Sequence, residues 1–304
     1  ELDINASISL ADKNIRSMAD EIINLPVIRD VPKYTADKLI MIKDELSITE
    51  TSFNPGDVNR VNNIKKAVER INGSIIEPGA CFSVNQVIGP RTEENGFKSA
   101  PVIIENQLVP GIGGGICQVA TTLYRAVLLS GLKVIERRHH SFPPGYVEVG
   151  QDATIAGRDI DLKFQNSSAF PVYLHGVVSS AAITFRIFGY KQNKDSRVEL
   201  ESRIIEVYEP GPDEIILDKK LKKGERKPGR EAKKGYKVEV YRNTFEGDDL
   251  VSREIVSTDT YRAIRGQIRV GPGGDSLEVP ASGDGGSDSN YEYIEEPDNP
   301  PAGF

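Results

Sequence analysis

Cys117 is the residue of this chain whose surroundings best suit covalent chemistry. It follows Gly113, Gly114 and Gly115, and the apolar residues after it recur at helical spacing. Backbone N–H groups and the helix dipole converge at the N-terminus of a helix, where they lower the pKa of a thiol. The glycines let a substrate carbonyl approach the backbone, so the same N–H groups could stabilise an oxyanion. We therefore interpret Cys117 as a candidate nucleophile.

A thiol nucleophile needs a base, and two histidines follow Cys117 along the chain. His140 is the preferred base because it lies at the end of an expected strand. His139 is nearly as good, because strand alternation directs only one of the pair inward. Asp152, beyond a Pro-Pro-Gly turn, could orient the histidine. This order of Cys, His and Asp resembles that of papain-like and transglutaminase-like cores, although the chain lacks the Trp of their usual histidine context.

Three alternatives leave Cys117 without a catalytic role. A free Cys often packs as a small hydrophobe, and the three glycines would then form only a tight turn. A disulfide between Cys81 and Cys117 would abolish a thiol mechanism. The run of Arg137, Arg138 and the two histidines could instead form an anion-binding edge. The residues alone leave these alternatives open.

The composition excludes several classes of protein. The 304 residues include 38 basic and 45 acidic side chains, and the net charge of −7 argues against nucleic-acid binding, which usually needs a basic face. No apolar run approaches the roughly 18–20 residues that span a membrane. With 2 Cys and 3 His, a metal centre would use nearly all of these residues, so we expect neither a metal nor a cofactor. Because the chain begins with Glu1, we expect that a leading signal, anchor or domain has been removed.

Capping residues and apolar periodicity predict the elements that must position the candidate site. Asp12 is expected to cap a first helix that ends near Leu25-Pro26. The apolar positions of this helix are Ile15, Met18 and Ile22. Residues 34–49 fit a strand or a short helix. A clearer helix is expected over residues 55–73, with Asp57 as its cap.

The helix that carries Cys117 is expected to begin near Ile116 and to stop at Gly131. A hairpin is expected over residues 102–109, with its turn at Glu105-Asn106. Further strands are expected at residues 74–76, 132–135, 160–164, 172–178 and 183–188. Residues 194–273 alternate polar and apolar side chains between turn glycines, which predicts an all-β module. Residues 274–304 lack a core pattern and are expected to be disordered.

Six stretches of the sequence resemble the VanW family. They are Asn59–Ile64 (NRVNNI), Ile71–Ser74 (INGS), Pro78–Ser83 (PGACFS), Gly89–Phe97 (GPRTEENGF), Val109–Gln118 (VPGIGGGICQ) and Gln151–Ile155 (QDATI). The match covers roughly residues 50–180 and implies association with the cell envelope of Gram-positive bacteria. It implies neither antibiotic resistance nor a settled activity.

The resemblance implies a functional role for several residues. Cys117, the pair His139 and His140, and Asp152 fall on motif positions, whereas Cys81 looks like a spare thiol. Three further motif residues either bind substrate or hold a loop by hydrogen bonds. These are Arg91, Glu94 and Asn95.

The all-β module resembles a G5 domain over about residues 204–272. The resemblance rests on Gly224, Gly229, Val238–Arg242, Ser252–Glu254 and Ile268–Gly271. It implies binding of glycans that contain N-acetylglucosamine. Tyr236, Tyr241 and Tyr261 could stack on sugar rings, or they could merely cover a thin sheet. The basic stretch 219–234 either contacts anionic wall polymers or is a solvated loop.

We therefore expect an α+β VanW-like domain with helices packed on an antiparallel sheet, joined to an elongated all-β module. The expected segments are 1–50 as the remnant of a preceding domain or extension, 51–193 as the VanW-like domain, 194–273 as the G5-like module and 274–304 as an acidic disordered tail.

The leading functional hypothesis is an extracellular enzyme, held at the cell wall or membrane through a segment outside this chain. Cys117 would attack an amide or acyl carbonyl of peptidoglycan, as a cysteine-dependent amidase or transpeptidase-type acyl transferase. Gly113, Gly114, Gly115 and Gln118 would hold the substrate. The alternatives are a non-catalytic protein that binds peptidoglycan or another wall glycan, and a surface spacer. Nothing in the sequence sets the oligomeric state.

Overall fold

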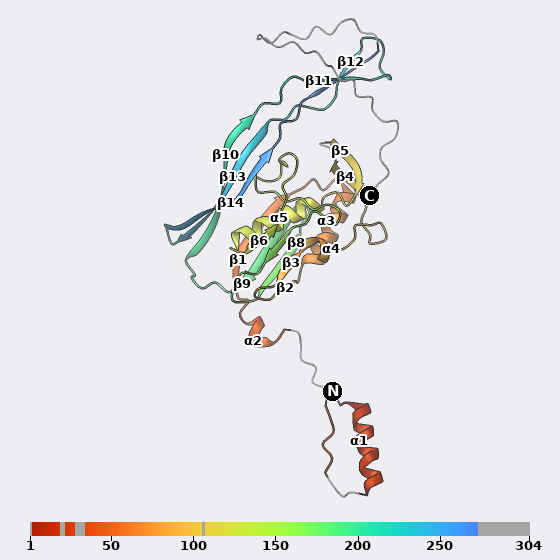
Figure 1. Ribbon diagram of the computed structural model, residues 1–304, viewed down its shortest axis with the longest axis vertical. Helices are drawn as coiled ribbons and strands as arrows, with labels where there is room; N and C mark the ends of the chain where they lie inside the picture. Colours follow the sequence, from red (N-terminus) through yellow and green to blue (C-terminus); the bar gives the residue numbers. More distant parts are fainter. Residues whose placement is uncertain (1, 19–21, 28–33, 105–106, 273–304) are drawn as a thin grey trace. The chain divides into compact units, whose positions relative to one another are not determined.

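The computed structural model describes residues 2–18, 22–27, 34–104 and 107–272 (Figure 1). The chain divides into two compact units, Glu1–Met41 and Ile42–Phe304. The predicted turn at Glu105-Asn106 and the predicted disordered tail lie outside the described residues. In the described part, no helix is both long enough and apolar enough to cross a membrane.

The first unit contains the helix α1 (Ile4–Ser17) and the short helix α2 (Ala36–Leu39). Asp3 caps α1, because its carboxylate accepts a hydrogen bond from the N–H of Ala6 at 2.9 Å. The helix ends at Met18, which adopts a left-handed conformation with φ 52°.

The predicted bounds of this first helix are wrong. Asp12 lies inside α1 rather than at its start, and it forms an ion pair with Arg16 at 2.8 Å. Asp3 already supplies the capping oxygen, and the left-handed Met18 ends the helix well before Leu25-Pro26. The apolar side chains expected on its buried face, including Ile15, are exposed.

A four-stranded antiparallel sheet forms the base of the second unit, in the order β1-β9-β8-β2. Its strands are β1 (Asp44–Ser52), β9 (Ala182–Gly189), β8 (Val172–Val178) and β2 (Ile75–Ile76). The helices α3 (Val58–Ile71) and α5 (Ile116–Leu129) contact this sheet (Figure 1). The predicted α+β arrangement is confirmed, and residues 44–50, expected in the N-terminal extension, belong to the sheet.

α3 has the predicted cap, and both helices bury most of their predicted apolar stripes, although Val58 at the start of α3 is exposed. Asp57 caps α3 and accepts a hydrogen bond from the N–H of Arg60 at 2.9 Å. The stripe residues that are buried in the core of this unit are Ile64, Val68 and Ile71 in α3 and Ile116, Val119, Leu123 and Val127 in α5. Burial of these side chains against the sheet explains why the helices form where the apolar spacing predicts them.

Smaller elements surround α5. A three-stranded sheet has the order β3-β7-β6, and a hairpin joins β4 to β5. These elements are β3 (Cys81–Ser83), α4 (Val84–Ile88), β4 (Ser99–Ile104), β5 (Gln107–Ile112), β6 (Lys133–Glu136) and β7 (Lys163–Gln165). The predicted hairpin and strands are confirmed, although β7 begins only at Lys163 because Ile160 instead pairs with Ala156 in an isolated bridge.

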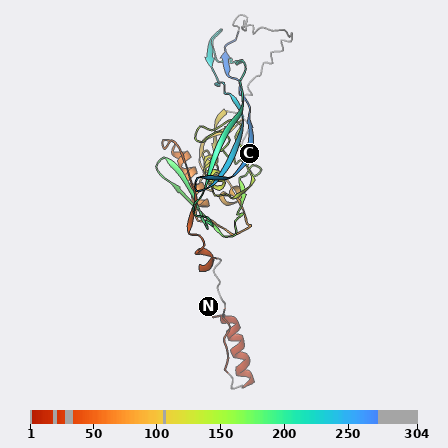
Figure 2. The same ribbon diagram turned by 90° about the vertical axis from the view of Figure 1, so that its left-hand side faces the viewer.

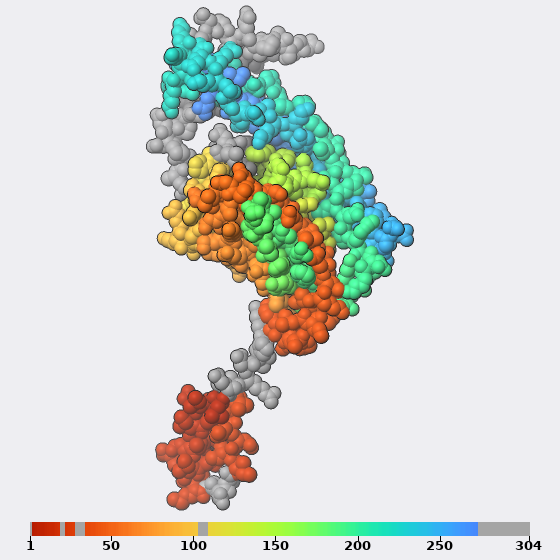
Figure 3. Space-filling view, turned by 180° about the vertical axis from the view of Figure 1, so that it is seen from behind, coloured from red at the N-terminus to blue at the C-terminus, as the bar shows by residue number. Residues whose placement is uncertain are grey.

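The all-β module is also confirmed. One sheet has the order β10-β13-β14 and a second has the order β11-β15-β12. The strands are β10 (Ser196–Tyr208), β11 (Glu214–Leu217), β12 (Arg226–Pro228), β13 (Gly235–Glu246), β14 (Asp249–Tyr261) and β15 (Gln267–Val270). Figure 2 shows the long strands of the first sheet running along the helix–sheet body, and Figure 3 shows the green-to-blue surface of the module beside that body.

Hydroxyl groups fix α5 to the edge strand β1. The hydroxyl of Ser47 donates to the carbonyl of Ala126, and that of Thr49 donates to the carbonyl of Thr122, each at 2.8 Å. The hydroxyls of Thr51 and Thr122 lie 2.7 Å apart. Each of these buried polar groups has a partner, so the interface sets one register of the helix on the strand.

Asn63 anchors the glycine loop that precedes α5. Its side-chain amide donates to the carbonyls of Gly114 at 3.0 Å and Lys98 at 2.9 Å, and its oxygen accepts from the N–H of Lys98 at 2.8 Å. Gly114 has no room for a side chain, because a Cβ there would lie 2.6 Å from the carbonyl oxygen of Pro101. The loop is therefore held against α3 and the β4–β5 hairpin.

We expect the substitution Asn63→Ala to lower the free energy of unfolding by about 3 kcal/mol. It leaves a buried carbonyl and a backbone amide without partners, and each such loss costs about 1–3 kcal/mol. Urea denaturation followed by circular dichroism measures the change. Asn59→Ala is the matched control, because Asn59 lies exposed on the same helix and donates to the Ser99 carbonyl at 2.9 Å. Equal losses in the two variants would contradict the anchoring role.

Candidate active site

Cys117 lies in the first turn of α5, as predicted. Gly115 caps the helix with φ 103°, a conformation that residues with a side chain rarely adopt. The Cys117 thiol is half-buried and donates a hydrogen bond to the Ile155 carbonyl at 3.4 Å. Among the described residues, the amides of Gly115 and Cys117 donate to no protein acceptor. The start of α5 therefore brings together a thiol and N–H groups that are open to a ligand.

Cys81 does not pair with Cys117. Both thiols are free, and Cys81 is exposed on β3, opposite Gln165 of β7. The alternative of a disulfide between them is therefore excluded.

His140 and Asp152 form a short buried contact next to Cys117. The imidazole Nδ1 lies 2.5 Å from Oδ2 of Asp152, and the same oxygen accepts a hydrogen bond from the backbone N–H of His140 at 2.7 Å. Asp152 is 0% exposed and His140 7% exposed. The imidazole also hydrogen-bonds to the thiol of Cys117. Because Asp152 occupies Nδ1, Nε2 is the nitrogen that faces the thiol.

The three side chains shift one another's ionisation. Burial alone would raise the pKa of Cys117, but the hydrogen bond to His140 and the charges of His140 and Arg91 outweigh it and lower the pKa. Burial disfavours the His140 imidazolium, yet its bonds to Asp152 and Cys117 raise its pKa to about 9. Burial likewise opposes ionisation of Asp152, but His140 holds its pKa below the ordinary value. The contacts at this site therefore favour the ionised forms of the three side chains, a thiolate, an imidazolium and a carboxylate.

Two further side chains contribute to the surroundings of the thiol. The guanidinium of Arg91 donates to the side chain of Asn85 and its charge stabilises the Cys117 thiolate. Tyr146 hydrogen-bonds to Thr121, and burial together with the Cys117 charge raises its pKa. Tyr146 is not among the residues predicted from sequence, although its position after the Pro-Pro-Gly turn, between His140 and Asp152, is a usable signal.

Gln118, predicted to contact substrate, has its side chain in the core. Its amide donates to the Thr51 hydroxyl at 3.1 Å and to the Ser52 carbonyl at 2.8 Å, and its oxygen accepts from Arg60 at 2.7 Å. The side chain thus ties α5 to β1 and α3.

The loop residues Glu94 and Asn95 are not joined to the thiol by any contact in the described structure. The side-chain amide of Asn95 donates to the Pro90 carbonyl at 2.9 Å, which holds the loop itself. Glu94 is exposed. Of the three motif residues predicted to bind substrate or hold this loop, the structure brings only Arg91 to Cys117.

Tyr261, predicted to stack on sugar rings, is fully buried beside the histidines. Its hydroxyl donates to Oδ1 of Asp152 and accepts from the N–H of Gly150 at 3.1 Å. Its ring lies 4.7 Å from that of His139, whose Nδ1 lies 2.6 Å from the carbonyl of His140. The glycan-stacking prediction for Tyr261 is therefore wrong, because a buried ring offers no face to a sugar. The contacts of His139 leave His140 as the histidine that faces Cys117.

The other two predicted glycan-binding tyrosines are half-buried on the module. They are Tyr236 and Tyr241. The Tyr241 hydroxyl donates to Glu239 at 2.6 Å, and guanidinium groups of Arg203 and Arg253 lie 5.3 and 4.3 Å from its ring centroid.

Arg137 is buried and paired, so the predicted anion-binding edge does not form around it. Its guanidinium donates to both carboxylate oxygens of Asp259 at 2.6 Å.

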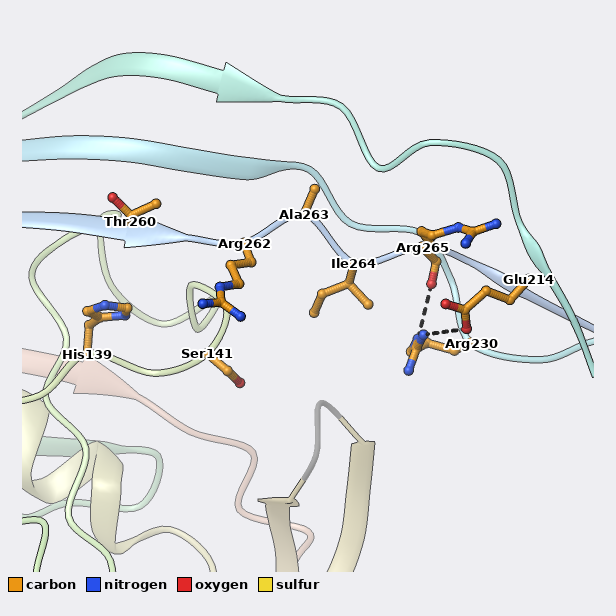
Figure 4. A pocket seen from close by; sticks show the side chains of 9 residues that line it. All are labelled: His139, Ser141, Glu214, Arg230, Thr260, Arg262, Ala263, Ile264 and Arg265. Carbon is orange, nitrogen blue, oxygen red and sulfur yellow. Dashed lines mark hydrogen bonds and ion pairs between the residues drawn. The ribbon is translucent and has the colours of Figure 1, made fainter. Parts of the chain in front are cut away.

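A groove of about 510 Å³ lies beside the histidines, between the loop of residues 139–141 and the segment 260–265 (Figure 4). Its residues are His139, Ser141, Glu214, Arg230, Thr260, Arg262, Ala263, Ile264 and Arg265. Glu214 pairs with Arg230 at 3.3 Å. The exposed Arg262 directs its guanidinium into the groove (Figure 4). Three arginines against one carboxylate make the groove positive.

Two family models match this chain. Residues 59–188 match the family described as VanW like protein, and residues 201–273 match the G5 domain. The first match contains Cys117, both histidines and Asp152, and the second contains Tyr261.

Similar curated proteins come from two bacteria. The uncharacterized protein YoaR of Bacillus subtilis strain 168 is 37% identical over 153 residues, which are 50% of this chain and 50% of YoaR. The vancomycin B-type resistance protein VanW of Enterococcus faecalis strain V583 is 31% identical over 139 residues, which are 44% of this chain and 50% of VanW. The chain thus spans about half the length of these relatives.

Two solved structures resemble parts of the chain. The IgA1 protease G5 domain is 29% identical with a TM-score of 0.18, and it matches 27% of this chain and 96% of its own. HP0197-G5 is 22% identical with a TM-score of 0.14, and it matches 24% of this chain and 96% of its own.

We expect Cys117 to be alkylated by iodoacetamide with an apparent pKa below the value of about 8.5 for a free thiol. The thiolate persists as the pH falls until the lowered pKa is crossed, so labelling should slow only at a lower pH than for a free thiol. Peptide mass spectrometry of the unreduced protein measures the rate at each pH. The exposed thiol of Cys81 is the internal control for access of the reagent. Labelling of Cys117 only above pH 8.5, or none, would contradict an activated thiol.

Proposed function

We propose that this chain, which joins a VanW-like domain to a G5 domain, is an extracellular cysteine-dependent acyl transferase that acts on the bacterial cell wall. The observation that carries the proposal is the buried contact between His140 and Asp152, with the imidazole bonded to a thiol in the first turn of a helix. Paired groups of this kind, with shifted pKa values, are typical of nucleophilic catalysis.

The chemistry follows from the groups at the site. The Cys117 thiolate attacks an amide carbonyl, a C–S bond forms, and the negative charge moves to the carbonyl oxygen. The open amides of Gly115 and Cys117 are positioned at the helix start to stabilise that oxyanion. The C–N bond then breaks, and the His140 imidazolium gives its proton to the leaving amine.

The acyl group is then bound to Cys117 as a thioester. Water or an amine attacks the thioester, His140 takes a proton from the attacking group, and the C–S bond breaks to restore the thiolate. Asp152 fixes the imidazole orientation and compensates its charge throughout. Attack by water makes the enzyme an amidase, and attack by an amine makes it a transpeptidase.

The wall assignment rests on the two domains. VanW and G5 domains are typical of proteins associated with the cell wall, and the G5 domain is a glycan-binding domain. The name of one relative, vancomycin B-type resistance protein VanW, links that protein to vancomycin resistance. Peptidoglycan stem peptides supply the amide bonds that a thiol acyl transferase requires. We propose that the chain is held at the wall or membrane through a segment outside the sequence described.

Cys117→Ala should reduce release or exchange of stem-peptide amines from peptidoglycan fragments to background, because no thioester can form. His140→Gln should lower the rate about 10²–10⁴-fold, the range expected for loss of a general acid–base group. Liquid chromatography with mass spectrometry of the fragments measures both. Cys81→Ala is the matched control and should retain activity. Turnover that survives in Cys117→Ala would rule out the thiol mechanism.

A second candidate function is non-catalytic binding of an anionic wall polymer, and the positive groove supports it. Arg262 is exposed at its rim, and the Ile264 side chain supplies an apolar surface on the same side of the strand (Figure 4). Groups of this kind suit a carboxylate-bearing glycan or peptide, because the guanidinium binds the anion while the apolar surface contacts the chain.

Arg262→Ala should weaken binding of the full chain to insoluble cell wall about fivefold, which corresponds to about 1 kcal/mol. The wild-type affinity should also fall as salt is raised, because an exposed ionic contact is screened. Co-sedimentation at several salt concentrations measures both effects. Arg226→Ala removes the same charge from an exposed position in β12 and is the control. An equal loss of affinity for the cell wall in the two variants would show that the groove does not bind the polymer specifically.

A further inference from the structure

We infer that the G5 domain is part of the proposed active site, with Tyr261 and Asp259 acting as positioning residues for the Asp152–His140 pair. The inference rests on the proposed function, because it assigns to these residues the task of holding its catalytic carboxylate. It gives the G5 domain a role beyond glycan binding.

Tyr261 provides the first contact. The two oxygens of the Asp152 carboxylate have different partners: Oδ2 accepts two hydrogen bonds from His140. Oδ1 accepts one from the Tyr261 hydroxyl and a longer one, at 3.5 Å, from Arg137. Both Asp152 and Tyr261 are 0% exposed, so water cannot replace the phenol. A buried carboxylate needs all its partners, and this one takes a donor from each domain.

Arg137 provides the second contact, and it bridges the two domains. Its guanidinium donates to the backbone carbonyls of Asp152 at 2.6 Å and Gly150 at 2.9 Å. On its other side it is neutralised by the carboxylate of Asp259 at 2.6 Å. The nearest oxygen of the Asp152 carboxylate is 3.5 Å from the same guanidinium. Asp259 therefore takes the short ionic contact with Arg137, and the ion pair between Arg137 and the Asp152 carboxylate is the longer one at 3.5 Å.

The backbone before Asp152 is enclosed by the same sheet. A Cβ on Gly150 would lie 2.7 Å from Val240 and 3.1 Å from Val238, both on β13. The Gln151 side chain donates to the Ser202 hydroxyl of β10 at 3.0 Å. All three long strands of the module thus contact residues 150–152.

The charged and titratable groups around Asp152 come from three elements. They are His140, Arg137 and Tyr146 from the segment after β6, Asp259 and Tyr261 from β14, Tyr124 of α5, and Cys117 of α5 through the imidazole. Without the Tyr261 hydroxyl, the carboxylate can turn toward Arg137 and leave the imidazole. His140 then loses the carboxylate that stabilises its protonated form, the imidazolium.

The test uses the full chain with Cys117→Ala as background, so that the thiol does not contribute. The imidazole of His140 is titrated by NMR, which is tractable because the chain has only 3 His. Addition of Tyr261→Phe should lower the pKa of His140 by at least one unit, a tenfold change in its ionisation constant. The variant should remain folded, with a melting temperature a few degrees below that of the background, because the buried carboxylate and the Gly150 N–H each lose a partner. Tyr208→Phe is the control, because it removes a phenol of the same module that is bonded to Glu206 at 2.9 Å.

An unchanged His140 titration in folded Tyr261→Phe would overturn the inference. If that variant does not fold, Asp259→Asn gives the second test. It frees Arg137 to compete for the Asp152 carboxylate and should also lower the pKa of His140, and an unchanged value there would overturn the inference as well. The test also separates failure of this inference from failure of the proposed function. If the wild-type protein shows no turnover, the proposed function fails, but the effect of Tyr261→Phe on the His140 titration can still be measured.

Discussion

The short contact between His140 and Asp152 is the interaction on which the arrangement of this protein depends. A carboxylate with no solvent exposure is stable only when every oxygen has a partner, and here those partners come from two parts of the chain, residues 137–140 and β14. The hydroxyl of Thr121 on α5 binds both the N–H and the carbonyl of Ala153, at 3.0 and 3.1 Å, which fixes the next residue. The same helix presents Cys117, so the thiol and the carboxylate are both positioned relative to α5.

The buried contact between α5 and β1 contains several polar side chains. Thr122 and Gln118 are fully or almost fully buried, and both bond to β1. Apolar contacts alone would tolerate small shifts of a helix along a sheet, whereas a set of satisfied hydrogen bonds selects one register. This constraint explains why a side chain next to the nucleophile is committed to structure rather than to substrate.

Much of the second unit could be predicted from sequence because its signals are local. Asp57 and Gly115 mark helix starts, apolar stripes mark the buried faces, and the order of Cys117, His140 and Asp152 indicated the site before any geometry was known. Tyr261 could not be assigned in this way. It lies 109 residues from Asp152 along the chain, and nothing in its own strand distinguishes a buried partner of a carboxylate from an aromatic surface residue. The first helix was misplaced for a local reason, since Asp3 and Asp12 are both acceptable caps and only the fold selects between them.

The spacing of Asp259 and Tyr261 has a consequence for how such proteins can be recombined. The two residues are one strand repeat apart, so both point to the same face of β14, one toward Arg137 and one toward Asp152. Another G5 domain could replace this one by fusion only if it carried the same pair at the end of its last long strand. The interface between the two domains is therefore specific to this pair of residues. We expect the residues on its two sides to have changed together during evolution.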